Sequence, residues 1–288
     1  MANKYRTATI VIVLCAGMLS VPATTGFSKS SITPASQKDS RKLVLRSAVA
    51  LVADQETGEF LIEKKATAVL PIASITKLMT AMVVLDAGID MEESLTIEQG
   101  DMFGLRRRAR TLLPAGTELS RRETLLLALM ASDNRCARAL GRTYPGGIDA
   151  FVTAMNAKVQ SLGLTETRFE DTTGLSSNNV SSARDLVRLV NAAYKYTLIR
   201  EFTTSNEANI YSGRRILKFC NTNRLIQDHR WQIGLSKTGF IGAAGRCLVM
   251  QAHVAQRSLI IVLLDSQGKL TRVGDANRIK HWLERLSL

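Results

Sequence analysis

The sequence predicts an α+β protein in which an antiparallel sheet of about five strands is built from both ends of the folded chain and flanked by helices. Three observations support this fold class. Apolar, β-rich segments open the folded region, helical patterns fill its middle, and β-rich segments return after Leu235 before a final amphipathic helix. This order predicts a helical subdomain, at roughly residues 90–205, inserted between the two halves of the sheet.

The first part of the folded region is expected to form a β-hairpin and then a helix. Residues 47–53 and 59–64 are rich in β-formers, and the segment Gln-Glu-Thr-Gly at residues 55–58 is typical of the turn that joins two strands. Residues 77–85 are apolar enough for a buried helix, which we expect to end near Gly88.

The middle of the chain carries clear helix signals. Ser120 and Glu123 have the spacing of a capping box just before the apolar run at residues 124–130. A second helix is expected at residues 151–162, where a glycine follows, and Ser182 is expected to cap a third. The middle of the chain is therefore predicted to be mainly helical.

The last part of the chain returns to strands and closes with a helix. Residues 248–254 and 258–265 are expected strands around a short turn at residues 255–257. Residues 272–286 are expected to form an amphipathic helix. Its apolar residues at helical spacing are Ile279, Trp282, Leu283 and Leu286.

The N-terminus predicts export. Lys4 and Arg6 precede an apolar run at residues 8–19 that is short for a membrane span, and Val21-Pro22-Ala23 has the small residues of a cleavage site. We therefore expect residues 1–23 to be a secretory signal peptide, and the mature chain to be periplasmic. The alternative is an uncleaved N-terminal anchor.

The remaining chain is expected to be a leader and one domain. Residues 24–42 are rich in Ser, Thr, Lys and Gln, which predicts a flexible leader, and residues 43–288 show no long linker or repeat. The net charge is +13, or +11 without the predicted signal peptide. A basic chain can bind nucleic acid or anionic polymers, but no nucleic-acid-reading motif is present, so no nucleic-acid partner is expected. We expect a monomer.

The cysteines and histidines do not predict a metal site. Cys136, Cys220 and Cys247 remain after the signal peptide, without C-x-x-C spacing or nearby histidines, and the histidines are isolated from one another. We expect no metal and no cofactor, and we interpret the cysteines mainly as small buried side chains. A bridge between Cys220 and Cys247 is left open.

Three short motifs stand in a fixed order: Ser74-Ile75-Thr76-Lys77, Ser132-Asp133-Asn134 and Lys237-Thr238-Gly239. Each alone has a structural explanation, as a helix cap, a helix break or a solvated strand end. Together they supply a serine, a lysine to deprotonate it, a second hydroxyl, an amide and a cationic strand, which are the groups needed to attack an amide carbonyl.

The first motif suggests a nucleophile and its base. Ser74 is expected at a helix N-terminus, where backbone N–H groups and the helix dipole favour a developing oxyanion. Lys77 lies three residues further on, so both side chains share one helical face. A partly desolvated lysine near another cation can have a lowered pKa and act as a base.

The other two motifs suggest partners for this pair. We expect the Ser132 hydroxyl in the proton path to the leaving amine and the Asn134 amide in contact with Lys77 and a substrate carbonyl, with Asp133 facing away. Lys237-Thr238-Gly239 is expected at the end of an edge strand that can pair with an extended peptide. In it, the lysine supplies positive charge near Ser132, the threonine hydroxyl binds a carboxylate or carbonyl, and the glycine lets the substrate approach the backbone.

These motifs and the strings around them resemble low-molecular-mass penicillin-binding proteins of the D-Ala-D-Ala carboxypeptidase A peptidase family. Within it, the chain is most similar to D-alanyl-D-alanine endopeptidases of the penicillin-binding protein seven type. The resemblance covers about residues 48–284. The strings that carry it are PIASITKLMTAMVVLDA from Pro71, LLLALMASDNR from Leu125, YPGG from Tyr144, AMNAK from Ala154, TGLS from Thr173, SARDL from Ser182, NTNRL from Asn221, KTGF from Lys237 and AGRCLVM from Ala244.

The resemblance implies a β-lactamase/transpeptidase-like fold and acyl transfer on peptidoglycan stem peptides. Ser74 is then the acylated nucleophile and Lys77 its base, and the family's oxyanion hole corresponds to the backbone N–H groups of Ser74 and Phe240. β-Lactams are expected to trap Ser74 as covalent inhibitors. The remaining positions that match contact residues of the family are Ser132, Asn134, Lys237, Thr238 and Gly239.

Hydrolysis of D-alanyl cross-links by a serine DD-endopeptidase is the predicted activity. Many carboxypeptidases of the family have a second domain and a C-terminal membrane anchor. This chain ends 49 residues after Gly239, so we expect neither here, and this shortness favours the endopeptidase. The alternatives are a DD-carboxypeptidase that trims terminal D-alanine from pentapeptides and an inactive wall-binding protein. A class A β-lactamase is disfavoured because Glu166 and Glu170 lack the Leu-Asn neighbours of its deacylating glutamate.

Overall fold

The structure is a computed structural model that describes residues 43–102, 113–213 and 215–287. The predicted signal peptide and leader, residues 1–42, lie outside the described residues. Within the described ranges, no helix combines the length and the apolarity that crossing a membrane would require.

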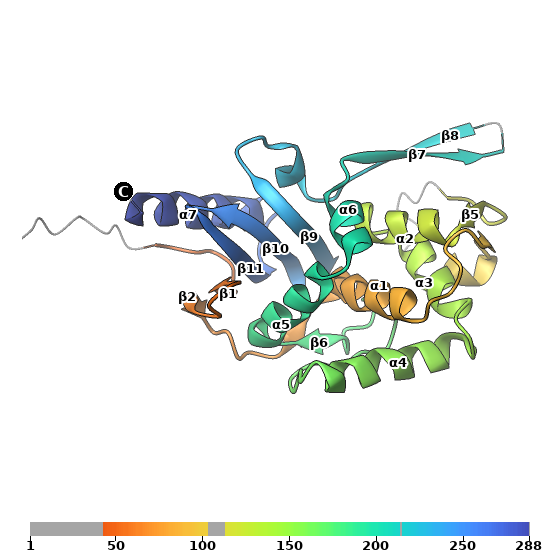
Figure 1. Cartoon of the computed structure of the whole chain (residues 1–288), viewed down its shortest axis with the longest axis horizontal. Helices are drawn as coiled ribbons and strands as arrows, with labels where there is room; N and C mark the ends of the chain where they lie inside the picture. Colours follow the sequence, from red (N-terminus) through yellow and green to blue (C-terminus); the bar gives the residue numbers. More distant parts are fainter. Residues whose placement is uncertain (1–42, 103–112, 214, 288) are drawn as a thin grey trace, which may run out of the picture. The chain divides into compact units, whose positions relative to one another are not determined.

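A five-stranded antiparallel sheet joins segments from the two ends of the described chain (Figure 1). Its strand order is β2-β1-β11-β10-β9. Strands β1 (Val49–Asp54) and β2 (Phe60–Lys64) come early in the sequence, whereas β9 (Gln232–Ile241), β10 (Gly245–Val254) and β11 (Arg257–Ser266) come late. The predicted α+β class, with a sheet drawn from both halves of the chain, is confirmed.

The central strands are buried on both faces. In β1, Val49 and Leu51 belong to one hydrophobic core and Ala50 and Val52 to the other, as the two-residue repeat of a strand requires. This explains why the strand is a continuous apolar run rather than an alternating one. The second core is closed by α7 (Thr271–Leu286).

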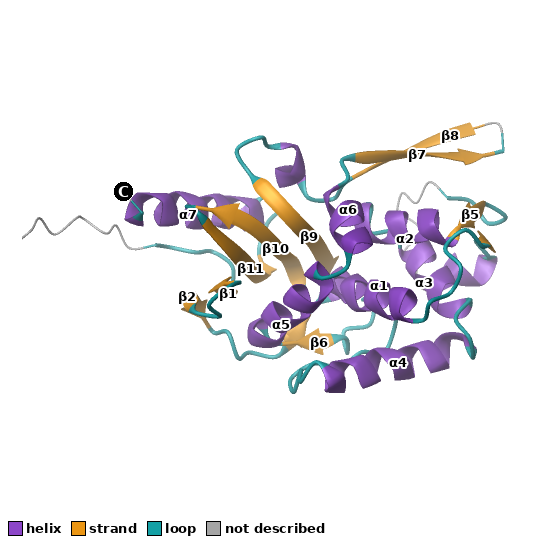
Figure 2. Cartoon of the chain, in the orientation of Figure 1, coloured by secondary structure: helices purple, strands orange, loops and turns teal. Residues whose placement is uncertain are grey.

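The other face of the sheet packs against the remaining helices, which gather on the side opposite α7 (Figure 2). Helices α2 to α6 occupy the range predicted as a helical subdomain, and they share one core with the sheet. The helices are α1 (Lys77–Asp86), α2 (Arg121–Met130), α3 (Asn134–Arg142), α4 (Gly147–Ser161), α5 (Ala183–Tyr194) and α6 (Thr197–Thr204).

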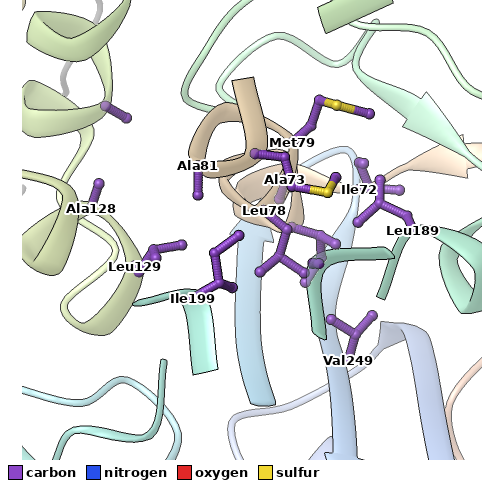
Figure 3. Packing of buried hydrophobic residues seen from close by; sticks show 14 of the residues in the cluster. Ile72, Ala73, Leu78, Met79, Ala81, Ala128, Leu129, Leu189, Ile199 and Val249 are labelled. Carbon is purple, nitrogen blue, oxygen red and sulfur yellow. The ribbon is translucent and has the colours of Figure 1, made fainter. Parts of the chain in front are cut away.

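Helix α1 lies at the centre of this core. Leu78, Met79 and Met82 have no solvent exposure. Helix α1 contacts each of the helices α2 to α6. Such a helix is held by tertiary burial on all sides rather than by one apolar stripe. Figure 3 shows side chains around it from α2, α5, α6 and β10, namely Ala128, Leu129, Leu189, Ile199 and Val249.

Short elements complete the described fold. Three two-stranded ribbons pair β3 with β6, β4 with β5 and β7 with β8. The bounds are β3 (Leu70–Pro71), β4 (Ser94–Thr96), β5 (Glu118–Ser120), β6 (Val180–Ser181), β7 (Glu207–Ser212) and β8 (Arg215–Cys220), with the 3-10 helices η1 (Ala73–Thr76), η2 (Gln99–Met102) and η3 (Arg224–Gln227).

The predicted helix caps are confirmed. The Ser120 hydroxyl accepts from the Glu123 backbone N–H while the Glu123 carboxylate accepts from the Ser120 N–H, which is a complete capping box. Ser182 likewise caps α5 by accepting from the Asp185 N–H. The helix expected at residues 151–162 begins earlier, at Gly147.

The cysteines correct one expectation. Cys136 and Cys247 are buried as predicted, but Cys220 is exposed at the end of β8. All three are free thiols, so the bridge between Cys220 and Cys247 is not formed.

Candidate active site

Ser74 lies in the 3-10 turn η1 that leads directly into α1. The residue before it, Ala73, has a φ of 47°, a left-handed conformation that costs free energy for any residue with a Cβ. The turn is held by the Thr76 hydroxyl, which donates to the Ala73 carbonyl at 2.8 Å. The nucleophile candidate therefore sits on a strained but well-anchored backbone.

Lys77 is the first residue of α1 and points its amino group into the site. Its side chain is buried, with 1% of the residue exposed. The Nζ atom donates to Ser74 Oγ at 3.0 Å, to Asn134 Oδ1 at 2.6 Å and to the Thr173 carbonyl at 2.6 Å. All three donor positions of the ammonium are thus used, and one of them meets the candidate nucleophile.

The surroundings of Lys77 lower its pKa to about 8. Burial is the main cause, because the charged form loses its hydration. The nearby carboxylates of Asp171 and Asp133 oppose this shift by favouring the ammonium. A lysine with this pKa is neutral far more often near pH 7 than an ordinary lysine, and a neutral amine can accept a proton.

Ser132, Asp133 and Asn134 connect α2 to α3. Ser132 has a φ of 58°, again left-handed, and its Oγ accepts from Lys237 Nζ at 2.8 Å. Asp133 was expected to face away from the site. It is buried and caps α3 by accepting from the Arg135 and Cys136 N–H groups at 2.8 Å and 3.1 Å.

Lys237, Thr238 and Gly239 lie inside β9 rather than at its end, which corrects the sequence-based placement. The strand is at the edge of the sheet, as predicted. Lys237 has an exposure of 1%. Burial lowers its pKa well below that of an ordinary lysine, and repulsion from Lys77 and Arg272 acts in the same direction.

Gly239 permits a close approach of the sheet to the nucleophile segment. A Cβ at this position would lie 2.9 Å from the Ile72 carbonyl oxygen, 3.1 Å from the Ala73 Cβ and 3.1 Å from the Ser74 nitrogen. The sequence analysis expected this glycine to admit substrate. The structure adds that it admits the backbone that carries Ser74.

The loop that supplies the Thr173 carbonyl was missed by sequence reasoning. Asp171 accepts from the Thr173 and Gly174 N–H groups, each at 2.6 Å. Gly174 has a φ of +83°, and a Cβ there would meet the Ala73 carbonyl oxygen at 2.0 Å. An Asp followed three residues later by Gly is a turn signal that could have identified this loop.

A second missed group, Arg272, contacts both β9 and β10. Arg272, at the start of α7, donates through Nη1 to the carbonyls of Gly239 at 2.9 Å and Cys247 at 2.8 Å. The Thr238 hydroxyl donates to Thr222 Oγ1 at 2.7 Å. These contacts join residues far apart in sequence, so no local sequence pattern could have predicted them.

The three motifs therefore come together around one point. The described structure forms two serine–lysine contacts, Ser74 with Lys77 and Ser132 with Lys237, and Asn134 joins the first pair. Phe240, whose backbone N–H is an oxyanion-hole candidate, follows Gly239 in β9, and its ring is exposed. The described residues hold no cluster of His, Cys, Asp and Glu suited to a metal ion.

Comparisons with known proteins agree with this arrangement. A family model described as D-alanyl-D-alanine carboxypeptidase matches residues 35–268. A D-alanyl-D-alanine endopeptidase of Pseudomonas aeruginosa is 47% identical over 245 residues, which is 83% of this chain and 78% of the relative. An Escherichia coli protein with the same description is 42% identical over 288 residues, 98% of this chain and 89% of the relative.

The fold also matches a solved structure. The crystal structure of a Streptomyces DD-transpeptidase superimposes with a TM-score of 0.77 at 25% sequence identity, and the match covers 84% of this chain and 98% of that one. The predicted transpeptidase-like fold and the family resemblance are thereby confirmed. The chain belongs to the D-alanyl-D-alanine carboxypeptidase family of serine peptidases.

Proposed function

We propose that the protein is a serine DD-endopeptidase that hydrolyses D-alanyl cross-links in peptidoglycan through an acyl-enzyme on Ser74. The observation that carries this proposal is the contact between Lys77 Nζ and Ser74 Oγ at 3.0 Å, made by a lysine whose pKa is lowered to about 8. This pairing supplies both a nucleophile and a base that is able to accept its proton.

Acylation begins with proton transfer from Ser74 Oγ to neutral Lys77, and Oγ attacks the D-alanine carbonyl carbon. The resulting ammonium is stabilised by Asn134 Oδ1 and the Thr173 carbonyl, which already accept from Nζ at 2.6 Å each. The backbone N–H groups of Ser74 and Phe240 are the proposed donors to the oxyanion. The strand segment with Phe240 can lie close to Ser74 because Gly239 has no Cβ, and a Cβ there would lie 3.1 Å from the Ser74 nitrogen.

Departure of the amine requires a proton. The Ser132 hydroxyl is the proposed donor, replenished from Lys77, and Lys237 at 2.8 Å holds that hydroxyl in place. Burial and the nearby charge of Lys77 lower the pKa of Lys237. Water then attacks the acyl-enzyme and releases Ser74, with Lys77 again accepting the proton.

Edge strand β9 is the proposed docking site for the substrate. An extended peptide can add to an exposed sheet edge through its backbone. The Thr238 hydroxyl and the Arg272 guanidinium lie beside Gly239. They are the proposed partners of the carboxylate nearest the scissile bond.

Two relatives described as D-alanyl-D-alanine endopeptidases, at 47% and 42% identity, favour cross-link cleavage. The second candidate is a DD-carboxypeptidase, which the description of the matching family model favours. An inactive wall-binding protein is the least supported alternative, because Ser74 contacts Lys77 and Ser132 contacts Lys237.

Labelling by a fluorescent penicillin tests the nucleophile. The wild type and the control Ser161→Ala, which changes a serine at the end of α4, should be labelled. Ser74→Ala should not be labelled. Continued labelling of Ser74→Ala would remove this serine from its role.

Incubation with cross-linked muropeptide dimers tests the reaction. Conversion of dimers to monomers by the wild type and not by Ser74→Ala supports the endopeptidase. Trimmed pentapeptides beside unchanged dimers would support the carboxypeptidase instead.

We also propose a periplasmic monomer. The predicted signal peptide at residues 1–23 supports the location. N-terminal sequencing of the exported protein should give a start near residue 24, and light scattering should give the mass of one chain. A start at Met1 or the mass of a dimer would contradict these expectations.

A further inference from the structure

A small pocket formed by the segment around η3, by β10 and by the start of α7 is lined by cations. Its volume is about 230 Å³, and its lining includes Thr222, Arg224, Arg246, Lys269 and Arg272. No carboxylate contributes to the lining. We refer to this site as the cationic pocket.

The four cations of the cationic pocket have no ion-pair partner among the residues that the structure describes. Elsewhere on the described surface, exposed cations are often paired, as Lys218 is with Glu207 at 2.7 Å. A cluster of like charges without counter-charges is unfavourable by itself. Such a cluster is therefore more readily explained by an anionic ligand than by a contribution to folding.

Two of these cations are held in place. Arg272 is fixed by its two bonds from Nη1 to the Gly239 and Cys247 carbonyls. The Arg246 guanidinium stacks over the Phe240 ring, 4.4 Å from the ring centre. Burial, together with the charge of Arg246, lowers the pKa of Arg272, so the two cations already interact unfavourably in the free protein. Pre-placed charges reduce the cost of ordering when an anion binds.

Two hydrogen bonds link the cationic pocket to the motif Lys237-Thr238-Gly239. Arg272 contacts Gly239 of β9, and Thr222 accepts from the Thr238 hydroxyl at 2.7 Å. In the proposed function, Thr238 and Arg272 meet the carboxylate nearest the scissile bond. The other cations, Arg224, Arg246 and Lys269, line the same pocket as Thr222 and Arg272. A longer leaving part that extended past Arg272 would therefore meet them.

The two candidate substrates differ in this leaving part. A pentapeptide loses a single D-alanine, which carries one carboxylate. A cross-linked substrate loses a second peptide, which carries further carboxylates. We propose that Arg224, Arg246 and Lys269 form an anionic subsite that binds a second carboxylate of the leaving peptide and so favours cross-linked substrates over pentapeptides. This inference rests on the proposed function.

The test compares substrates with one and with several leaving-side carboxylates. The variant combines Arg246→Gln with Lys269→Gln, which removes two charges and leaves Arg272 and Thr238 in place. The control is Arg285→Gln, which removes an exposed charge at the other end of α7, outside the cationic pocket. Three rates are measured for each protein: dimer cleavage, pentapeptide trimming and acylation by benzylpenicillin.

We expect kcat/KM for dimer cleavage to fall roughly tenfold in the double variant, since two exposed ion pairs contribute about that much. Penicillin acylation and any pentapeptide trimming should change less than about threefold, because one carboxylate is still met by Thr238 and Arg272. The control should match the wild type. Raising the salt concentration should reduce the difference between wild type and double variant.

Equal dimer cleavage by the double variant and the wild type would overturn the subsite, as would an equal loss in all three rates. These outcomes differ from a failure of the proposed function. In that case the wild type itself would leave dimers uncleaved although penicillin acylates it.

Discussion

At the scale of single residues, the pKa of Lys77 sets the pH range in which the site can react. Burial lowers its pKa to about 8. At pH 7 the neutral form is then present at about one part in ten, roughly 300 times more than for a lysine of ordinary pKa. Desolvation thus prepares the base without any residue that ordinarily titrates near neutral pH.

The pH dependence of acylation follows from this pKa. Because the neutral amine is the reactive form, the rate of penicillin acylation should rise with pH, reach half its maximum near pH 8 and level off above it. Stopped-flow or quench measurements between pH 6 and pH 10 would check this. A rate that does not vary with pH over that range would contradict it.

Asp133→Asn provides the matched variant for that profile. Asn keeps an oxygen for the Arg135 and Cys136 N–H groups but removes a negative charge that favours the Lys77 ammonium. The midpoint of the acylation profile should therefore move to lower pH, by less than about one unit. A shift to higher pH would show that another group controls the reaction.

Ser132 combines a reactive hydroxyl with a strained backbone, since its φ is 58°. Ser132→Ala and Ser132→Gly should both reduce acylation by about a hundredfold or more, because both lose the hydroxyl. Ser132→Gly should unfold with a free energy about 0.5–1 kcal/mol higher than Ser132→Ala, since glycine tolerates this φ. Urea unfolding measures the difference. Equal stabilities would remove the argument for strain.

At the scale of elements, the fit between β9 and η1 places the nucleophile next to the sheet. A methyl group at position 239 would press on Ile72, Ala73 and Ser74. Gly239→Ala should lower penicillin acylation at least about tenfold and the free energy of unfolding by about 1–3 kcal/mol. Gly242→Ala is the control, because a Cβ there meets nothing within 4 Å. Equal effects of both changes would contradict the proposed fit.

The elements that could be predicted from sequence carry local signals. A few neighbouring residues are enough to predict the Ser120 capping box, the hairpin of β1 and β2, and the apolar helix α1. Helix α3 and the ribbon of β7 and β8 were missed. Helix α3 begins inside the Ser132-Asp133-Asn134 motif, which was interpreted as a helix break. In β7 and β8, the apolar residues Tyr211 and Ile216 are exposed, so the sequence lacks the alternation of apolar and polar residues that marks a half-buried strand.

The candidate site divides in the same way. Ser74, Lys77, Ser132, Asn134 and Lys237 could be named in advance because short motifs contain them. The Thr173 carbonyl and Arg272 could not, because each reaches the site through a contact across the fold. Strand β9 was expected to end near Lys237, yet it continues to Ile241, since tertiary pairing with β10 extends it.

At the scale of the whole molecule, Asp275 ties the beginning of the described chain to α7. It is fully buried and accepts from the Ser47 N–H and hydroxyl, both at 2.6 Å, and from the Arg46 N–H at 3.0 Å. It also forms an ion pair with Arg278. Burial raises the pKa of this carboxyl, but the hydrogen bonds from Ser47 and Arg46 outweigh burial, so the net pKa is lowered.

Asp275→Asn should therefore reduce the free energy of unfolding by about 2–3 kcal/mol at pH 7. A carboxyl with a lowered pKa in the folded state stabilises the fold above its ordinary pKa of about 3.9, and this contribution is lost as the pH falls through the folded value. The difference between wild type and variant should shrink toward pH 3. Glu118→Gln, at an exposed position, should change stability by less than about 0.5 kcal/mol at either pH.

The position of β1 in the sheet determines how late during synthesis the chain can complete its sheet. Its partner β11 is the last strand of the sheet to be synthesised. Each residue from Val49 to Asp54 pairs with one between Leu259 and Leu264. Until those residues are synthesised, β1 has only β2 beside it, and an isolated hairpin is marginally stable in water. Strand β9, which carries Lys237, is joined to β1 only through β10 and β11, so the complete sheet that places Lys237 beside the Ser74 segment forms late. A growing chain therefore carries all three motifs before it carries a complete catalytic centre.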